Sequence, residues 1–433
     1  MKKLDVYLKN KFVGNLVQDD DGQMVFEYLE SWLNDPLAIP LSYSLPLRKE
    51  RFSTKECKGY FAGILPEENK RKIIAQNLGI SPKNDFSMLE RIGGECAGAV
   101  AFIPTDETLQ TSNCSYQVIN DHKLAKILRE LPQRPLMAGD KDIRVSLAGV
   151  QDKIAVHIPL NGQITIPHGT AISTHILKPA IERFEGVVFN EALCMKLANA
   201  IGLPSAKVEI GQVEDIDYLL IERYDRIRVP LSPRTIMGLN PHENATYLER
   251  LHQEDFCQAL GIVPEKKYQS EEGPSLKQCF DLLREVSSTP VIDIQNMLDA
   301  VIFNFLVGNH DAHGKNFSLL YRDQGLLQPG KYKGQYTRLA PLYDILSTIY
   351  YPDLSKKMAM KIGGEYSSEK IIPKHFEKMA EEAGLAKPLV KQRISEIVDI
   401  ILSKIPEIDI VHPVSEAVSA LIRNRCERAL NKV

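Results

Sequence analysis

The stretch VGNHDAHGKNFSLLY, residues 307–321, decides which fold the sequence favours. It places two histidines, two asparagines, one aspartate and one lysine between two apolar segments. The upstream segment, LDAVIFNFL at 298–306, is apolar almost all round, and FSLLY at 317–321 has the pattern of a strand. Polar groups buried between such elements are costly unless they have partners. A dense polar group at this junction therefore indicates a chemical role.

The spacing of three polar residues points to phosphoryl transfer. Asn316 follows Asp311 by five residues, and Asp344 ends the segment TRLAPLYD after a predicted hairpin that turns at 322–325. Kinase-type sites hold an aspartate, an asparagine and a second aspartate in this order. Mg²⁺ prefers hard oxygen ligands, so one carboxylate and one amide oxygen suffice beside the phosphates. A separate aspartate can orient an acceptor hydroxyl and accept its proton.

Three segments upstream can complete such a site. Lys178 ends the apolar strand HILKP, where its ammonium group can neutralise phosphate charge. The loop SLAGVQDK at 146–153 places a glycine beside an alanine, which lets backbone N–H groups approach phosphates, although it matches no established phosphate-loop pattern. The strand LLIERYDR at 219–226 ends where two lobes would meet, and its backbone can pair with an adenine edge.

Other interpretations of these residues stay open at this level. His310 and His313 have the HxxH spacing of a zinc site, but no third ligand is evident nearby in the sequence. The same group could also be a polar, non-catalytic helix end. Asp344 could cap a helix formed by ILSTIYY. Glu191 is interpreted as a first-turn residue favoured by the helix dipole, rather than as the carboxylate paired with Lys178.

The composition is that of an ordinary globular protein with several domains. The chain has 433 residues, too many for one core, so two or three domains are expected. A net charge of −3 argues against a dominant nucleic-acid surface. Seven scattered cysteines without a CxxC pair indicate reduced thiols. Because no apolar run approaches 18 residues and the start lacks a signal-peptide pattern, we expect a cytoplasmic protein without a membrane span.

Hydrophobic patterning divides the chain into three predicted parts. Residues 1–105 have the pattern of a small α+β unit, and residues 106–225 that of a strand-rich lobe. Residues 226–433 are predominantly helical by their 3.6-residue spacing. The overall prediction is therefore an α+β protein with a small unit, a sheet lobe and a helical lobe.

Turn and capping signals give some of these elements definite ends. The first hairpin is expected to turn at 9–11, and a five-stranded sheet is expected to include a hairpin around Asn161-Gly162. The helix NEALCMKLANAIGL is predicted to start at Asn190 as its cap and to end at Gly202. The segment HQEDFCQALGI is predicted to be helical as well.

Several segments together resemble the HipA-type proteins, the serine/threonine kinase toxins of bacterial toxin–antitoxin modules. In the family's order they are RVSLAGVQDK (144–153), THILKP (174–179), NEALCMKLANAIGL (190–203), IERYDR (221–226), HQEDFCQALG (252–261), NFLVGNHDAHGKNFSLL (304–320) and LAPLYDILS (339–347). GYFAGILPE and IGGECAGAVAFIP are similar to the family's N-terminal part. The resemblance spans nearly the whole chain, and HDAHGKN with PLYD is its most specific element. It implies a two-lobed kinase-like fold, with a β-rich N-lobe, an all-α C-lobe and an extra small N-terminal α+β subdomain.

The resemblance also implies roles for individual residues. Asp311 would be the catalytic base, and Asn316 and Asp344 would hold Mg²⁺. Ser146 would match the serine on which the family autophosphorylates. The residues expected to contact ATP are Ala148, Gly149, Val150, Gln151, Asp152, Lys153, Lys178, Glu222, Tyr224, His313, Tyr343 and Asp344, and Gln253 can also reach the nucleotide. Tyr224 replaces an often-seen phenylalanine, a change that removes no required group.

What the resemblance implies about function is specific. The chain would be an ATP- and Mg²⁺-dependent protein serine/threonine kinase that acts as a toxin on an aminoacyl-tRNA synthetase or another translation protein. Its partner would be a small HipB-like helix-turn-helix antitoxin that contacts DNA for both proteins. The alternative is a catalytically inactive, kinase-like co-repressor or scaffold. Such proteins usually lose at least one of Lys178, Asp311, Asn316 and Asp344, and all four are present here.

Overall fold

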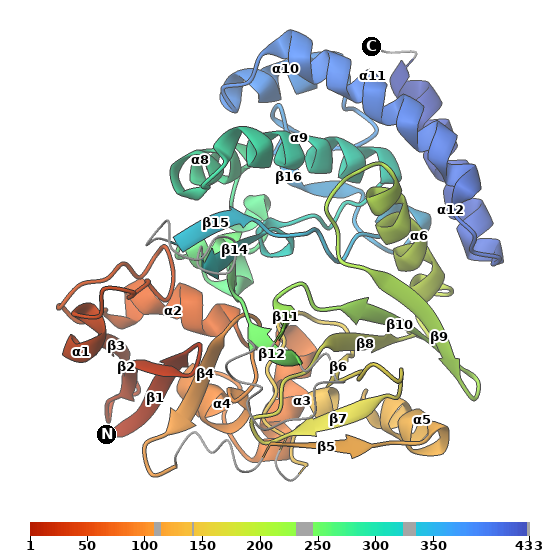
Figure 1. Cartoon of the computed structure of the whole chain (residues 1–433). Helices are drawn as coiled ribbons and strands as arrows, with labels where there is room; N and C mark the ends of the chain where they lie inside the picture. The colour runs from red at the N-terminus through yellow and green to blue at the C-terminus, as the bar shows by residue number, and fades with distance from the viewer. Residues whose placement is uncertain (108–113, 141–142, 231–245, 324–334, 431–433) are drawn as a thin grey trace.

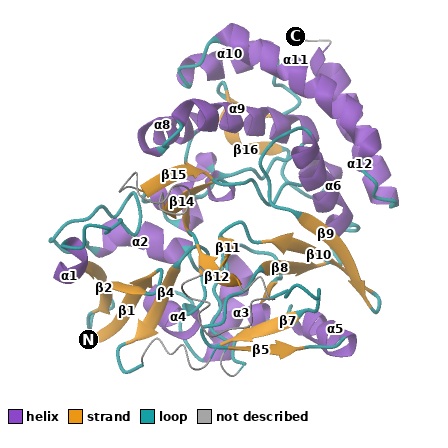
Figure 2. Ribbon diagram, in the orientation of Figure 1, coloured by secondary structure: helices purple, strands orange, loops and turns teal. Residues whose placement is uncertain are grey.

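A computed structural model describes residues 1–107, 114–140, 143–230, 246–323 and 335–430. The long helices gather at one end of the molecule and most of the strands at the other (Figure 1). Figure 2 shows the same division by element type, with short strands also present beneath the helices. The molecule thus has the predicted α+β architecture of a β-rich lobe and a helix-rich lobe.

The N-terminal unit is a four-stranded antiparallel sheet packed with helices. Its strands are β1 Lys2–Leu8, β2 Lys11–Gln18, β3 Met24–Tyr28 and β4 Val100–Pro104, in the order β3-β2-β1-β4. Its helices are α1 Glu30–Leu33, α2 Thr54–Gly63, α3 Glu68–Leu78 and α4 Asp85–Ile92. Lys9 and Asn10 have φ angles of 50° and 64°, the left-handed backbone that a two-residue hairpin turn requires. The predicted turn at 9–11 is confirmed.

The second sheet has four strands, one fewer than predicted. They are β6 Ile154–Val156, β8 His175–Pro179, β10 Ile216–Glu222 and β9 Val208–Val213, in that spatial order. The fifth predicted strand, β7 Thr165–His168, pairs instead with β5 Ser115–Val118, and an isolated bridge between His157 and Thr165 joins it to the end of β6. The Asn161-Gly162 turn lies in a loop that is too long for a tight hairpin. Strand β7 can therefore pair with a strand other than β6.

Helix α6, Val187–Ala200, crosses one face of this sheet and starts earlier than predicted. Gly186, in a left-handed conformation, precedes it, so Asn190 is inside the helix and is not its cap. The side chain of Asn190 is buried, accepts a hydrogen bond of 2.8 Å from the Ser347 N–H and donates one of 3.1 Å to the Ser347 carbonyl. Asn190 therefore fastens α6 to the segment that follows Asp344. Gly202 follows the helix with φ 86°, as expected for a helix end.

The helix-rich lobe also contains short strands, so the expectation of an all-α C-lobe is wrong in this detail. Its helices are α7 Phe256–Ala259, α8 Leu276–Val286, α9 Pro290–Val307, α10 Pro373–Glu382, α11 Lys387–Lys404 and α12 Pro413–Leu430. A three-stranded sheet in the order β13-β14-β15 consists of β13 His252–Asp255, β14 Ser318–Asp323 and β15 Gln335–Leu339. Two hairpins, β11 Arg226–Pro230 with β12 Thr246–Arg250 and β16 Lys357–Ile362 with β17 Glu365–Ser367, complete the described strands. Helix α5, Asp121–Glu130, packs near β9 in the other lobe.

Two sequence predictions in this lobe are wrong. The segment 252–262 is not one helix, because its first four residues form β13 and Asp255 then caps the short helix α7. Asp255 accepts from the Gln258 N–H, the reciprocal capping arrangement that marks a helix start and not its interior. Of the turn predicted at 322–325, Arg322 and Asp323 belong to β14 and are not turn residues; the rest of the predicted turn lies outside the described residues.

Helix α9 is the central helix of the helical lobe. Among the described residues it is the one helix long and apolar enough to cross a membrane, with a mean hydropathy of 1.3. Within the molecule, however, 61% of it is buried, because α8, α11 and α12 pack around it. That burial is what a core helix of a folded lobe shows.

The four-stranded β6-β8-β10-β9 sheet separates two hydrophobic cores. Leu177 and Val156 face a core shared with the N-terminal unit. Leu219 and Ile221 face the other core, which α6 and the helical lobe complete. Lys178 is in register with Leu219, and residues paired across two strands share a face. The lysine side chain is therefore directed toward α6 and the helical lobe.

Candidate active site

Lys178 on β8 is held between two carboxylates from different elements. Its ammonium group donates to Glu191 Oε1 at 2.7 Å and to Asp344 Oδ1 at 2.5 Å. Lys178 and Glu191 are both buried, so the pair with Glu191 is largely shielded from water. The prediction that Glu191 is a first-turn helix residue and not a partner of Lys178 is wrong, because α6 starts four residues earlier and turns Glu191 toward the sheet.

The electrostatics of this triad keep Asp344 ionised. Burial would raise the pKa of Asp344, but the adjacent Lys178 outweighs it and lowers the pKa to about 2. Asp344 has φ 58°, a left-handed conformation that is strained for a residue with a side chain and is found in excess at functional sites. It does not cap a helix, because the residues directly after it are not helical.

The catalytic-loop candidate, residues 309–316, follows the end of α9 at Gly308. Its Asp311 is largely buried, and its carboxylate accepts a hydrogen bond of 2.7 Å from the Tyr268 hydroxyl. Burial raises the pKa of Asp311 to about 6, with a further contribution from the negative charge of Asp344. Asp311 thus has the pKa that suits a general base near neutral pH.

Asn316 and Asp344 carry the kinds of oxygen donor that Mg²⁺ prefers. Asn316 lies at the end of a short 3₁₀ turn, and its Nδ2 is 3.4 Å from the Asp311 carbonyl oxygen, to which it donates. That hydrogen bond leaves the amide oxygen as an acceptor. With the ionised Asp344 carboxylate, the two residues offer the hard oxygen ligands that Mg²⁺ prefers.

The two histidines of the HDAH sequence do not form a zinc site. Both ring nitrogens of His310 are engaged, Nδ1 with the Ser355 carbonyl at 3.0 Å and Nε2 with the Ser368 hydroxyl at 2.8 Å. His313 is buried, and burial lowers its pKa to about 3. In the part of the chain that the structure describes, no group of three or more His, Cys, Asp or Glu is placed to hold a metal ion.

The phosphate-loop candidate, 146–153, folds against the N-terminal unit. Gly149 has φ 109°, and its carbonyl accepts from the Glu67 N–H at 3.2 Å. The Lys153 ammonium donates to the Ala148 carbonyl at 2.6 Å, and burial and the nearby Lys178 lower its pKa to about 8. Of the remaining loop residues, Val150 and Gln151 are uncharged. The Asp152 carboxylate pairs with the Lys70 ammonium group at 2.6 Å.

Ser146, at the start of this loop, is fully buried. Its hydroxyl donates to the Ile64 carbonyl at 2.9 Å, and its N–H donates to the Glu95 carbonyl at 2.9 Å. A buried, hydrogen-bonded serine cannot reach another protein's active site, nor its own, without movement of the loop. Any phosphorylation at Ser146 therefore requires the loop to leave this position.

Tyr224, expected near adenine, contacts two other residues expected at the nucleotide, Gln253 and Tyr343. The Tyr224 hydroxyl donates to the Gln253 side chain, and the rings of Tyr224 and Tyr343 lie 6.0 Å apart. The Tyr343 hydroxyl donates to the Lys315 carbonyl at 2.5 Å, which connects this region to the catalytic-loop candidate. The Glu222 N–H already donates to the Lys207 carbonyl at 2.9 Å, so it is not free to meet an adenine edge.

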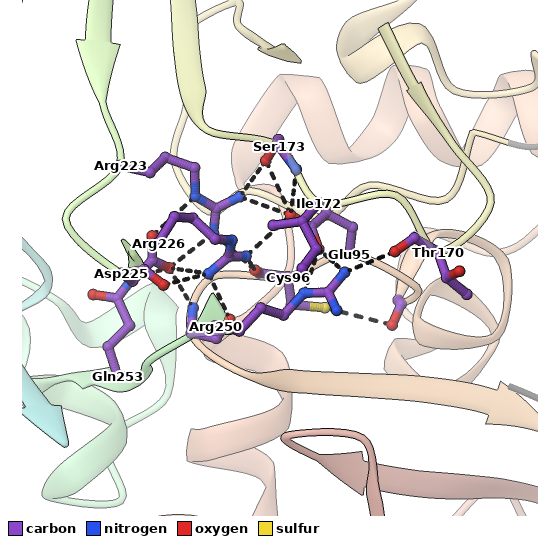
Figure 3. A network of polar contacts seen from close by, with 12 residues as sticks. Glu95, Cys96, Thr170, Ile172, Ser173, Arg223, Asp225, Arg226, Arg250 and Gln253 are labelled. Carbon is purple, nitrogen blue, oxygen red and sulfur yellow. Dashed lines mark hydrogen bonds and ion pairs between the residues drawn. The ribbon is translucent and has the colours of Figure 1, made fainter. Parts of the chain in front are cut away.

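A buried ionic network fixes the same region to the N-terminal unit (Figure 3). Glu95 receives hydrogen bonds from Arg223 at 3.3 Å, Arg226 at 3.0 Å and Arg250 at 2.6 Å. Asp225 forms ion pairs with Arg223 at 2.8 Å and Arg226 at 3.0 Å. Burial would raise the pKa of Glu95, but the three arginines outweigh it and the pKa is lowered. This network could not be predicted from sequence spacing, although the alternating charges of ERYDR are a signal for ion pairs at this position.

The fold and the site together define a kinase-like protein. The Lys178–Asp344 ion pair joins the two lobes, and the buried Asp311 loop lies beside it. Residues 4–103 match the family model described as the HipA N-terminal domain, and residues 145–405 match the HipA-like C-terminal domain. The chain belongs to the HipA-type family of serine/threonine kinase toxins from toxin–antitoxin modules.

Individual relatives cover nearly all of the chain. It is 45% identical to the putative kinase Y4mE of Sinorhizobium fredii, over 92% of this chain and 90% of that protein. It is 28% identical to the serine/threonine-protein kinase toxin HipA of Shewanella oneidensis, over 99% of this chain and 96% of that protein. In a solved complex of HipA, HipB and operator DNA from Shewanella oneidensis, one chain matches with a TM-score of 0.81 at 27% identity, covering 99% of this chain and 97% of that one.

Proposed function

We propose that this chain is an ATP- and Mg²⁺-dependent protein serine/threonine kinase and the toxin of a toxin–antitoxin pair. The observation that carries the proposal is the contact of 2.5 Å between Lys178 of one lobe and Asp344 of the other. It joins a lysine that we propose to neutralise phosphate charge to a carboxylate that we propose to bind the metal, and the charge of Asp344 contributes to the raised pKa of the base candidate Asp311.

Each residue has a separate part in the proposed reaction. Asp311 orients the acceptor hydroxyl of the protein substrate and accepts its proton as the phosphoryl group transfers. Lys178 and Lys153 bind phosphate oxygens of ATP, and the loop 148–153 covers them. Asn316 and Asp344 would hold Mg²⁺, which supplies charge neutralisation for the phosphates.

The proposed substrate and partner follow from the family resemblance and from charge. We propose a translation protein such as an aminoacyl-tRNA synthetase as the substrate, and a HipB-like helix-turn-helix protein as the antitoxin. The Shewanella oneidensis complex supports a partner of this kind, because it contains HipA, HipB and operator DNA. A net charge of −3 suits a protein that meets DNA mainly through its partner. The proposed location is the cytoplasm.

The test of the kinase proposal uses Asp311→Ala. We expect the wild-type chain to transfer labelled phosphate from ATP to protein, and the variant to lose at least about 10³-fold in rate. Nucleotide affinity, measured by calorimetry, should change little, because Lys178 and Asp344 are untouched. Phosphoproteomics after induction of either form would then identify the substrate. A variant that still labels protein at the wild-type rate removes Asp311 from the proposed role.

Ser146 gives a second prediction, concerning self-inactivation. A phosphate there adds a charge of about −1.5 to −2, which the buried site at Ile64 cannot accommodate. The phosphorylated loop should therefore leave its place over the nucleotide. We expect Ser146→Ala to stay active longer during incubation with ATP, and the phosphorylated protein to bind ATP poorly. Equal ATP affinities of the two forms in a calorimetric titration would contradict this mechanism.

A further inference from the structure

Glu67 of the N-terminal unit bridges two lysines beside the proposed active site. It lies between α2 and α3, and its side chain is buried. One carboxylate oxygen, Oε2, accepts from the Lys267 ammonium at 2.8 Å, and the other, Oε1, is 3.6 Å from the Lys315 ammonium. Burial alone would raise the pKa of Glu67, but the two lysines outweigh it and lower the pKa. Glu67 is thus a buried anion with two cationic partners from the helical lobe.

Both lysines are next to residues of the proposed reaction. Lys315 directly precedes the metal-ligand candidate Asn316 in the same 3₁₀ turn. Lys267 directly precedes Tyr268, whose hydroxyl donates to the Asp311 carboxylate at 2.7 Å. The Glu67 carboxylate therefore pairs with side chains of two segments, one that carries the candidate base and one that donates a hydrogen bond to it, although it does not touch the base itself.

The same N-terminal segment also contacts the phosphate loop. The Glu67 N–H donates to the Gly149 carbonyl at 3.2 Å, and Pro66 forms a parallel bridge with Gly149. Three residues earlier, the Ile64 carbonyl accepts from the Ser146 hydroxyl at 2.9 Å. One short segment of the N-terminal unit thus contacts the phosphate loop with its backbone and the catalytic-loop candidate with its side chain.

Buried charges of both signs meet in this cluster, and Lys267 is also 3.8 Å from the exposed Glu68. Lys315 also pairs with Asp255 at 2.9 Å and donates to the Gly63 carbonyl at 2.8 Å. Two buried carboxylates, Glu67 and Asp255, therefore face two buried ammonium groups, Lys267 and Lys315. Removing one partner of a buried ion pair leaves an uncompensated charge, which is strongly unfavourable. Neutralising Glu67 should loosen both lysines and the loops that carry them.

We infer that Glu67 is a positioning residue that couples the phosphate loop to the catalytic loop, so that the N-terminal unit is part of the active site. The inference rests on the proposed kinase function for its consequence, but the coupling itself is a property of the folded chain. Glu67 would act through Lys267, Tyr268 and Lys315, and not by contact with ATP or the substrate. The N-terminal unit is firmly placed for this role, since the buried network around Glu95 anchors it to the lobe junction.

Hydrogen exchange of the nucleotide-free protein tests the coupling directly. In Glu67→Gln we expect amides of residues 146–153 and 309–316 to exchange at least about fivefold faster than in the wild type, while amides in β1 and α9 are unchanged. The matched control is Glu68→Gln, which removes the same charge one residue on, from a side chain that is 67% exposed and 3.8 Å from Lys267. Exchange in Glu67→Gln that equals the control at both loops would overturn the inference.

Kinetics give a second reading that a general loss of stability would not reproduce. We expect Glu67→Gln to lower kcat for phosphate transfer about tenfold, with a smaller rise in the KM for ATP, because the loop 146–153 loosens while Glu191 still holds Lys178. Lys267→Gln should have a similar effect, and the double variant should be no worse than either single variant. If the kcat losses of the two single variants simply add in the double variant, Glu67 and Lys267 do not act as one pair.

The two experiments separate this inference from the proposed function. If the wild-type chain transfers no phosphate, the kinase proposal fails, yet the exchange measurement still decides whether Glu67 couples the loops. If the wild type is active and Glu67→Gln exchanges and reacts like Glu68→Gln, the kinase proposal stands and the coupling is wrong. Should Glu67→Gln fold poorly, Lys267→Gln tests the same pair from the other side, with the same exchange readout.

Discussion

At the scale of single residues, Glu191 decides where Lys178 lies. The lysine has two carboxylate partners, but Glu191 is the buried one, while the side chain of Asp344 is 37% exposed. If Asp344 takes up a metal ion, Glu191 is the partner that remains available to hold the ammonium group against the sheet. We therefore expect Glu191→Gln to raise the KM for ATP about tenfold, because a hydrogen bond between two charged groups contributes about 1.5–3 kcal/mol.

The measurement for Glu191→Gln is a steady-state titration with ATP at fixed protein substrate. Its control is Glu182→Gln, an exposed acidic residue in the turn before α6, which should leave the KM unchanged. A KM for Glu191→Gln within twofold of the wild type would show that Asp344 alone places Lys178.

Residue types at short spacing were predictable, and partners from distant segments were not. Asp311, Asn316 and Asp344 could be identified in the sequence because they lie within 34 residues, in apolar surroundings where a buried polar group is costly unless it has a partner. Glu191 looked like any glutamate near a helix start. Only the true start of α6 at Val187, set by Gly186 and not by Asn190, shows that Glu191 faces the sheet.

At the scale of elements, the loop after α9 sets the pH at which the proposed base works. Burial raises the pKa of Asp311 to about 6, and the Tyr268 hydroxyl opposes that rise by stabilising the carboxylate. A base must be deprotonated to act, so kcat/KM should be constant above about pH 7 and fall about tenfold per unit below pH 6. Tyr268→Phe removes the stabilising hydrogen bond, so we expect this acidic limb to move to higher pH by about one unit.

The pH–rate profile of kcat/KM checks the effect of Tyr268→Phe. Above pH 8 both enzymes should have Asp311 ionised, so the rates should differ there less than about threefold. Tyr247→Phe, at an exposed position on β12, is the matched control and should keep the wild-type profile. An acidic limb that stays in place in Tyr268→Phe would mean that Asp311 is not the group that titrates.

Elements with a strong local signal were predicted well, and those that depend on a partner strand were not. The first hairpin was predictable because its turn lies between two alternating runs. The apolar and polar residues of β7 alternate equally well. Its own sequence, however, does not indicate that its partner strand is β5, some 50 residues upstream. The helix predicted over 252–262 was wrong for a different reason: the four residues of β13 end at Asp255, which also caps α7, and a helical period can be fitted through the strand and the helix together.

At the scale of the whole molecule, the N-terminal unit and the kinase-like lobes are held together by buried charge. Glu95 comes from the N-terminal unit, while Arg223 and Arg226 follow β10 and Arg250 ends β12. More than 125 residues separate Glu95 from each arginine, so no sequence period or motif spacing could have paired them. The fold class could be predicted from the order of elements, whereas this fixed placement of one unit on another could not.

The stability of the molecule should depend strongly on this one carboxylate. Glu95→Gln leaves the buried Arg223 and Arg226 with Asp225 as their acidic partner and removes the carboxylate that Arg250 pairs with, so we expect the free energy of unfolding to fall by about 3–5 kcal/mol, the usual cost of breaking a buried ion pair from one side. Glu107→Gln is the matched control, because Glu107 is 56% exposed and pairs with Arg144 at the surface, where an ion pair contributes at most about 1 kcal/mol. Urea unfolding followed by circular dichroism compares the two variants. Equal losses would mean that the network is placed by the packing around it, and that the N-terminal unit stays docked without Glu95.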